Sequence, residues 1–256
     1  MTESAIATYP SLKGKTVVVT GGGSGIGAQL TRRFAGQGCK TAFIDIDRPA
    51  SEALAAELKA AGHSAHFEEC DLRDIEALRA AIGNCRKLFG PVTVLVNNAA
   101  HDERHATEEV TPEYWDDRMA VNLKHQFFAS QAVLPDMKAA GGGSIINFGS
   151  VSWMLGMGGY AAYTAAKSAV LGLTRSLARD YGPFNIRVNA IAPGWILTER
   201  QIKLWLTPEG EADLMKGQCL KRRLYPDDVA RVVLFLSSDE ASAITNQQYV
   251  VDAGWT

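Results

Sequence analysis

Tyr163 and Lys167 lie four residues apart and carry side chains that can move a proton. In a helix, this spacing puts both on one face, one turn from each other. Ser150 adds a hydroxyl after residues 144–148, an apolar run that predicts a strand. A tyrosine acts as a base near neutral pH only if its pKa falls by about 3 units, or roughly 4 kcal/mol, and a lysine cation at about 4 Å supplies that much. The three groups suit proton transfer at an alcohol or carbonyl oxygen, although the tyrosine–lysine spacing also arises by chance in helices without a chemical role.

A run of glycines joins the first predicted strand to the first predicted helix. Residues 15–20 are a β-branched run typical of a buried parallel strand, Gly21 to Gly27 follow at once, and a helical pattern covers residues 28–35. A loop that binds pyrophosphate needs this order, because glycines let the backbone approach the phosphates and the helix N-terminus donates N–H groups. We therefore expect a bound dinucleotide.

Carboxylates follow two later strands. Asp45 ends the strand predicted for residues 41–45, where it can accept hydrogen bonds from the adenosine ribose and repel a 2′-phosphate. This favours NAD, while Arg48 nearby leaves NADP open, and a solvated strand end is the alternative role for Asp45. Asp71 follows the strand predicted for residues 63–70 and is placed to face the adenine.

Amide side chains mark two further positions. Asn97 and Asn98 lie near the C-terminal end of the strand predicted for residues 92–100, at the edge where open parallel sheets bind ligands. Asn97 can equally tie neighbouring strands together. Asn122 lies inside the helix predicted for residues 111–137, where Asn is unfavourable because it competes for backbone hydrogen bonds. The sequence there predicts a local irregularity or a functional role.

Composition limits the class of protein. The chain of 256 residues suits one doubly wound α/β domain, 1–256, with a mostly parallel seven-stranded sheet. A net charge of −2 and a pI near 6.2 predict no nucleic-acid or membrane partner. Four scattered cysteines and an N-terminus without a signal-peptide pattern favour a cytoplasmic protein. The five histidines show no convincing metal-ligand spacing, so no metal is expected.

Two more segments bear on the site. Residues 195–224 form the least regular part of the chain, and we interpret them as a substrate lid. Residues 160–181 predict a helix rich in alanine, and small side chains let a second helix approach closely, which favours a homo-oligomer. The alternative is that this helix only packs against the chain's own sheet.

Together these motifs resemble those of the short-chain dehydrogenase/reductase family, over nearly the whole chain and in the same order. The resemblance rests on Thr20-Gly21-x-x-x-Gly25-x-Gly27, Asn97-Asn98-Ala99, Asn122, Ser150, Tyr163-x-x-x-Lys167 and Pro193-Gly194. It implies a Rossmann domain, hydride transfer between an alcohol carbon and NAD or NADP, and pairing of the helix over residues 160–181 in a homotetramer.

The resemblance also implies a role for each matching residue. Tyr163 is the general base during oxidation, Lys167 lowers its pKa, Ser150 orients the substrate oxygen and Asn122 holds a water-linked proton relay. The implied cofactor-binding residues are Gly21, Ser24, Gly25, Ile26, Gly27, Asp45, Asp71, Leu72, Asn98, Tyr163, Lys167, Pro193, Gly194, Ile196 and Thr198.

Within the family, the chain is similar to bacterial aldose 1-dehydrogenases, especially pentose enzymes acting on D-xylose or L-arabinose. Residues 97–105, 146–153, 207–212 and 252–255 carry this likeness. A sugar needs polar partners and an aromatic face, and the candidates are Asp102, Glu103, Arg104, Ser150, Trp153, Trp195 and Gln201. The alternatives are a dehydrogenase of a polyol or another secondary alcohol, a 3-oxoacyl reductase, and a dinucleotide-binding regulator without catalysis.

Overall fold

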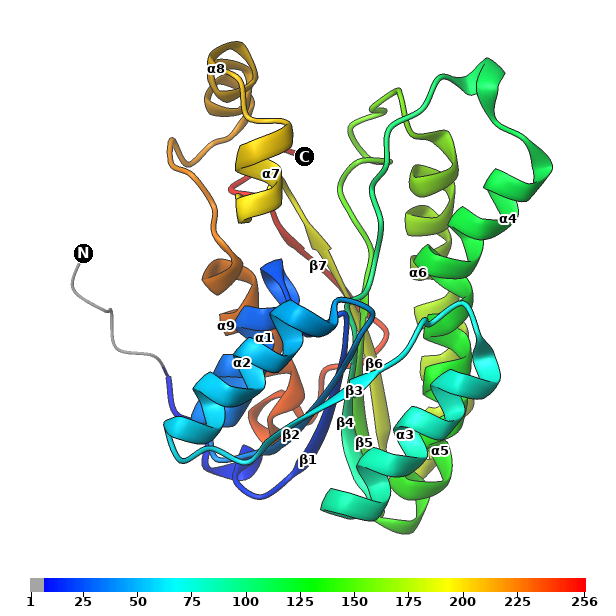
Figure 1. Ribbon diagram of the computed structural model, residues 1–256, viewed down its shortest axis with the longest axis vertical. Helices are drawn as coiled ribbons and strands as arrows, with labels where there is room; N and C mark the ends of the chain where they lie inside the picture. The colour runs from blue at the N-terminus through cyan, green and yellow to red at the C-terminus, as the bar shows by residue number, and fades with distance from the viewer. Residues whose placement is uncertain (1–6) are drawn as a thin grey trace.

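The computed structural model describes residues 7–256, and within them seven strands form one sheet (Figure 1). The order is β3-β2-β1-β4-β5-β6-β7, and every neighbouring pair is parallel. The strands are β1 Thr16–Thr20, β2 Lys40–Asp45, β3 Ala65–Glu69, β4 Val92–Asn97, β5 Gly143–Phe148, β6 Ile186–Pro193 and β7 Gln248–Val251. The predicted fold class is confirmed, and the sheet is wholly parallel where the sequence predicted a mostly parallel one.

Helices cover both faces of the sheet. The α-helices are α1 Gly25–Gly36, α2 Arg48–Ala60, α3 Ile75–Phe89, α4 Pro112–Met119, α5 His125–Ala139, α6 Ala161–Tyr181, α7 Glu199–Leu204, α8 Pro208–Gly217 and α9 Pro226–Ser237. Short 3-10 turns lie at Pro10–Leu12, Thr107–Glu109, Gly182–Phe184 and Asp239–Ala241. Helices α1, α2 and α9 lie against one face, and α3, α5 and α6 lie against the other (Figure 1). Among the described helices, none combines the length and the apolar character that a membrane span requires.

Each face of the sheet has its own apolar core, and strand alternation separates the two. Val17 and Val19 of β1 point into the core beneath α1, α2 and α9, whereas Val18 points into the core beneath α3, α5 and α6. All three side chains are fully buried. A strand covered on both faces reads as a continuous apolar run, which is why residues 15–20 predicted a buried parallel strand.

The strand order indicates which edge of the sheet binds ligands. The chain builds outward from β1 through β2 to β3, and then continues on the other side of β1 with β4 to β7. Open α/β sheets bind ligands outside the carboxyl ends of the strands, at the point where the order reverses. The glycine turn after β1, the amides after β4 and Ser150 after β5 therefore meet at one edge.

The helix predicted for residues 111–137 is interrupted at Asn122. Helix α4 ends at Met119, residues Ala120–Lys124 form a π-helical turn, and α5 follows. Thr111 caps α4, because its hydroxyl oxygen accepts a hydrogen bond from the Tyr114 N–H at 3.2 Å. The predicted irregularity is confirmed. Single π-helical turns of this kind are common at functional sites.

Residues 195–224 are more regular than the sequence predicted. Helices α7 and α8 occupy most of this segment, and Figure 1 shows them beyond the carboxyl ends of the strands. Each has a threonine cap: Thr198 accepts from the Gln201 N–H at 3.2 Å, and Thr207 accepts from the Gly210 N–H at 3.1 Å. These Thr-x-x caps were present in the sequence as a helix-start signal.

Candidate active site

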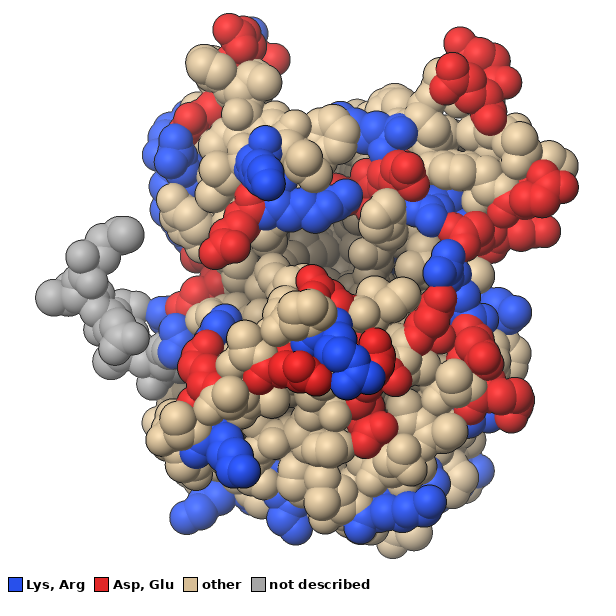
Figure 2. Space-filling model, viewed as in Figure 1, with Lys and Arg blue, Asp and Glu red and all other residues tan. Residues whose placement is uncertain are grey.

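A cavity of about 1560 Å³ lies at the carboxyl edge of the sheet, and Figure 2 shows a hollow near the centre of this face. A typical site for one small molecule measures roughly 300–1,000 Å³, so this cavity has room for a dinucleotide and a substrate together. Every residue that the sequence assigned to cofactor binding lines it. No three His, Cys, Asp or Glu side chains of residues 7–256 gather to hold a metal ion.

The N-terminus of α1 faces the cavity with free backbone donors. Ser24 is the N-cap, but its side chain makes no capping hydrogen bond, so the first N–H groups of α1 lack a side-chain partner. Gly27 lies so close to the preceding turn that a Cβ atom would stand 1.8 Å from the Gly21 carbonyl oxygen. Both features fit a pyrophosphate at this helix end.

Asp45 is buried at the end of β2 and holds the glycine turn. Its two carboxylate oxygens accept hydrogen bonds from the N–H groups of Gly23 at 2.8 Å and Asp47 at 3.0 Å. The alternative of a solvated strand end is therefore wrong. Arg48 is the residue for which the sequence left NADP binding open. It forms ion pairs with Glu52 and Glu69, so two carboxylates already occupy its guanidinium.

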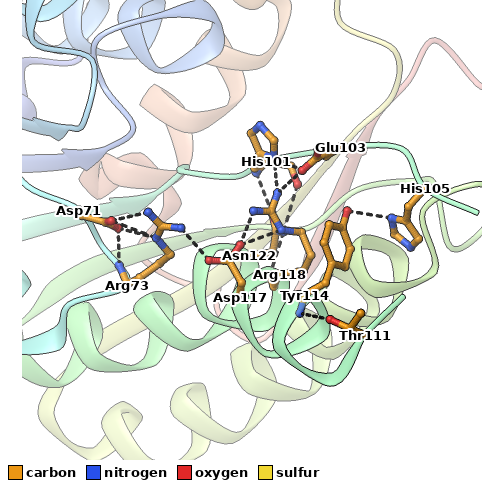
Figure 3. A network of polar contacts seen from close by, with 10 residues as sticks. All are labelled: Asp71, Arg73, His101, Glu103, His105, Thr111, Tyr114, Asp117, Arg118 and Asn122. Carbon is orange, nitrogen blue, oxygen red and sulfur yellow. Dashed lines mark hydrogen bonds and ion pairs between the residues drawn. The ribbon is translucent and has the colours of Figure 1, made fainter. Parts of the chain in front are cut away.

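Asp71 lines the next part of the cavity wall, beside Leu72. Its hydrogen bonds from the Arg73 side chain lower the pKa of the Asp71 carboxyl below its ordinary value, although burial opposes this. Arg73 also reaches Asp117 of α4 at 2.7 Å (Figure 3). The carboxylate therefore remains charged, and Arg73 fixes it in position at the cavity wall.

Tyr163 and Lys167 lie on the first turns of α6, as the spacing predicted. The Lys167 Nζ is 5.8 Å from the centre of the Tyr163 ring and donates a hydrogen bond to the Phe148 carbonyl oxygen at 2.8 Å. Ser150 follows β5 and lines the same part of the cavity. The structure thus brings together the phenol, the ammonium and the hydroxyl.

The pKa values of this pair differ from the expectation drawn from the sequence. Burial raises the pKa of Tyr163, the charge of Asp102 adds to this rise, and a hydrogen bond with Ser150 opposes it. Burial also lowers the pKa of Lys167 to about 7. The protein's own groups therefore raise the Tyr163 pKa instead of lowering it, because the cost of burying the charged phenolate exceeds what the hydrogen bond with Ser150 returns.

Asn122 is fully buried and does not line the cavity. Its side chain fixes the loop after β4, accepting from the His101 N–H at 2.9 Å and donating to the His101 carbonyl oxygen at 3.1 Å. Figure 3 shows Arg118 beside it, bound to His101, Glu103 and Asp117. The π-helical turn therefore places the Asn122 side chain where it binds the backbone of His101, at the start of the loop over residues 101–110.

Gln126 belongs to this cluster and was missed in the sequence. Its side-chain amide donates to the Asn122 carbonyl oxygen at 3.2 Å and to the Phe148 carbonyl oxygen at 3.3 Å. The Phe148 oxygen thus accepts from both Gln126 and Lys167. A glutamine within a helix gives no sequence signal for this contact, although buried polar groups are usually hydrogen-bonded, as the Gln126 amide nitrogen is here.

Asn97 takes the structural role that the sequence left open. Its side-chain amide donates to Asn147 Oδ1 of the neighbouring strand at 2.9 Å. Asn147 in turn donates to the Thr174 hydroxyl of α6 at 3.0 Å. These buried bonds tie β4, β5 and α6 together directly below the site, whereas Asn98 lines the cavity.

The substrate end of the cavity lies between the loop over residues 101–110 and α7. Asp102 accepts from Arg200 and, at 2.7 Å, from the Gln201 side chain, which itself accepts from the Trp195 indole N–H at 2.9 Å. The predicted substrate residues that line the cavity are Asp102, Arg104, Ser150, Trp195 and Gln201. Tyr160 and Trp205 also line it and were missed.

Two predicted substrate residues do not line the cavity. Glu103 lies between two residues that line it, but its own carboxylate turns to Arg118 at 3.1 Å. Trp153 lies in the turn after β5, whereas its neighbours Val151 and Ser152 line the cavity. The sequence could not separate these positions, because the direction of a loop side chain has no fixed period.

The fold and the site define a Rossmann-type oxidoreductase, and comparison with known proteins gives the family. A family model described as enoyl-(acyl carrier protein) reductase matches residues 21–256. The chain is 52% identical to D-xylose 1-dehydrogenase of Caulobacter vibrioides over 249 residues, which cover 97% of this chain and 98% of that protein. It is 51% identical, over 96% of both chains, to a Rhizobium meliloti protein named as a galactose dehydrogenase.

A solved structure of a short-chain alcohol dehydrogenase from Sinorhizobium meliloti 1021 superposes with a TM-score of 0.91 at 31% identity. It covers 96% of this chain and 98% of its own. The chain belongs to the short-chain dehydrogenase/reductase family, and the resemblance drawn from the sequence is confirmed.

Proposed function

We propose that this chain is a nicotinamide-dependent aldose 1-dehydrogenase, which oxidises the anomeric hydroxyl of an aldose to the lactone. The observation that carries the proposal is the 52% identity with D-xylose 1-dehydrogenase over nearly the full length of both chains. The polar and aromatic lining of the substrate end supports it, because Asp102, Gln201 and Trp195 suit a molecule with several hydroxyls and an apolar face. D-Xylose and L-arabinose are the first candidates, followed by D-galactose.

The chemistry assigned to the site is removal of a proton and a hydride from one carbinol group. The nicotinamide supplies the hydride acceptor when it is bound. Tyr163 takes the proton from the anomeric hydroxyl, and Ser150 holds that oxygen by a hydrogen bond. Lys167 anchors the end of β5 through Phe148, and its Nζ lies 5.8 Å from the centre of the Tyr163 ring. Asn122 serves the site by fixing the backbone of His101.

We assign NAD as the preferred dinucleotide, held by the residues that line the cavity around α1. Asp45 carries a buried negative charge where a 2′-phosphate would lie, and Arg48 is paired with two carboxylates. The residues that would face the remaining parts of the dinucleotide are Asp71, Leu72, Asn98, Lys167, Pro193, Gly194, Ile196 and Thr198.

Alternative functions remain in the same family. A D-threitol dehydrogenase of Mycolicibacterium smegmatis is 37% identical, which keeps a polyol among the substrates to be tested. The 3-oxoacyl reductase is less favoured because the relatives at 51–52% identity are named for sugars. A regulator without catalysis is disfavoured, since Ser150, Tyr163 and Lys167 are all present at one cavity.

We further propose a cytoplasmic homotetramer with residues 195–224 as the lid. Cys39, Cys70 and Cys85 are buried free thiols, which suits a reducing compartment. Contacts of Asp102 with Arg200 and Gln201 join the loop after β4 to α7 and hold this segment beside the cavity.

The direct test is a substrate panel with both dinucleotides, followed by absorbance of the reduced cofactor. The proposal expects turnover with one or more of D-xylose, L-arabinose and D-galactose, and a lactone as product. Turnover restricted to polyols or acyl thioesters would replace it with the corresponding alternative.

A further inference from the structure

Arg104 differs from the other arginines of the cavity. Within the described residues, five arginines line the cavity, and four form ion pairs with carboxylates: Arg32 with Glu57, Arg73 with Asp71, Arg118 with Glu103 and Arg200 with Asp102. Arg104 has neither an ion pair nor a hydrogen bond to its guanidinium within that part of the chain. A planar cation with free donors is the usual protein partner of a carboxylate or a phosphate.

The guanidinium of Arg104 is held in place by two aromatic rings. Its central carbon lies 4.6 Å from the centre of the Trp205 ring and 5.1 Å from that of Tyr160. Contacts on the ring faces leave the N–H groups free, because these groups point outward in the guanidinium plane. The buried indole N–H of Trp205 also has no acceptor among the described residues. Donors therefore exceed acceptors at this position.

Arg104 lies at a distance from the reacting groups that a sugar can bridge. Tyr160 contacts both Arg104 and Tyr163, because its ring centre lies 5.1 Å from the central carbon of the Arg104 guanidinium and 5.6 Å from the Tyr163 ring centre. The neighbouring carboxylate of Asp102 is already bound by Arg200 and Gln201. Within the described residues, no carboxylate is paired with Arg104, which lines the cavity together with Asp102, Tyr160 and Tyr163.

We propose that Arg104 binds an anionic group on the terminal carbon of an aldose, so that the enzyme oxidises acidic sugars at C1. The inference rests on the proposed function and extends its substrate class to hexuronic acids or aldose phosphates. The terminal anion takes no part in the reaction. The C1 hydroxyl still loses its proton to Tyr163, and the nicotinamide, when bound, would supply the hydride acceptor, as for a neutral aldose.

The test compares D-galacturonate and D-galactose 6-phosphate with neutral D-galactose, using wild type, Arg104→Gln and Arg104→Lys. The readout is the ratio of kcat/KM for each acidic sugar to that for D-galactose. Arg104→Gln is expected to lower this ratio at least tenfold for the sugar whose anion fits, and Arg104→Lys to lower it less, since lysine keeps the charge without the fork. Lys203→Gln is the matched control, because Lys203 is an exposed cation of the same lid that does not line the cavity.

Binding gives a second readout that does not need turnover. Tryptophan fluorescence in the presence of NADH should show saturable binding of D-galacturonate or D-galactose 6-phosphate, weakened at least tenfold in Arg104→Gln and weakened by added salt. If neutral sugars are oxidised but neither anion binds, the inference is wrong and the proposed function stands. An equal loss for acidic and neutral sugars in Arg104→Gln also overturns it. If no sugar is turned over, the proposed function fails, and the fluorescence result alone decides the role of Arg104.

Discussion

The ammonium group of Lys167 lies 5.8 Å from the centre of the Tyr163 ring, and its hydrogen bond goes to the Phe148 carbonyl oxygen at 2.8 Å. The lysine is therefore anchored to the end of β5, next to the strand end that carries Ser150. Burial makes the charged forms of both Tyr163 and Lys167 unfavourable. The fold places the two side chains for proton transfer, but burial makes a phenolate at Tyr163 and an ammonium at Lys167 both unfavourable in the protein alone.

Removing the phenol should separate binding from chemistry. Tyr163→Phe is expected to keep dinucleotide binding and lose turnover by at least about 100-fold, the lower end of what general acid–base catalysis contributes. Single-turnover kinetics and a cofactor titration measure the two effects. Tyr181→Phe, at the far end of α6, is the control. Turnover of Tyr163→Phe within threefold of wild type would remove Tyr163 from the proposed role.

The low pKa of Lys167 predicts a pH dependence of stability. Its pKa is about 7 in the folded protein and near 10.5 when unfolded, so between these values the unfolded state binds more protons. The free energy of unfolding should therefore rise with pH from about 7 towards 10, by up to about 1.4 kcal/mol per unit. Urea unfolding of wild type and Lys167→Met at several pH values isolates this contribution. A difference between the two proteins that does not change over this range would contradict the burial of a neutralised lysine.

Gln126 gives a test of the buried polar cluster. Gln126→Met keeps the size of the side chain but removes the donor to the carbonyl oxygens of Asn122 and Phe148. We expect the free energy of unfolding to fall by about 1–3 kcal/mol, because two buried hydrogen bonds worth roughly 0.5–1.5 kcal/mol each are lost. Gln131→Met, an exposed position of the same helix, should stay within about 0.5 kcal/mol of wild type. Equal stability of both variants would mean that Gln126 is not needed there.

Cofactor choice should follow the charge of Asp45. Asp45→Ala is expected to shift the ratio of kcat/KM for NADP over NAD upward about tenfold or more, because a negative charge no longer faces the 2′-phosphate. Asp45→Asn keeps an acceptor for the Gly23 N–H and separates the charge effect from the folding of the glycine turn. A wild-type preference for NADP greater than tenfold would show that Asp45 does not set the choice.

The sequence predicted the parts of this molecule that follow a period or a turn rule. The β-branched runs located the strands, the glycines located the turn into α1, and the misfit of Asn122 located the π-helical turn. It failed where side-chain direction in a loop decides the outcome, as for Glu103 and Trp153, which lie outside the cavity. It also gave the wrong direction for the Tyr163 pKa, because burial depends on the whole fold and not on spacing along one helix.

Exposed apolar positions on α4, α5 and α6 form a surface on which a second copy of the chain could pack. Trp115 of α4 and Phe127 of α5 are each 39% exposed, although large aromatic side chains are usually covered. On α6, a Cβ added to Gly172 would meet no atom within 4 Å, so this face of the helix is open to a partner. A second copy packed on α4, α5 and α6 would cover all three positions, in keeping with the proposed tetramer.

Light scattering at micromolar concentration should give a mass near four times 27.6 kDa, and Gly172→Trp should shift it towards smaller species. Gly36→Trp, at the end of α1 where an added Cβ also meets nothing within 4 Å, is the matched control and should leave the mass unchanged. A fully active monomer in wild type would contradict the proposed assembly.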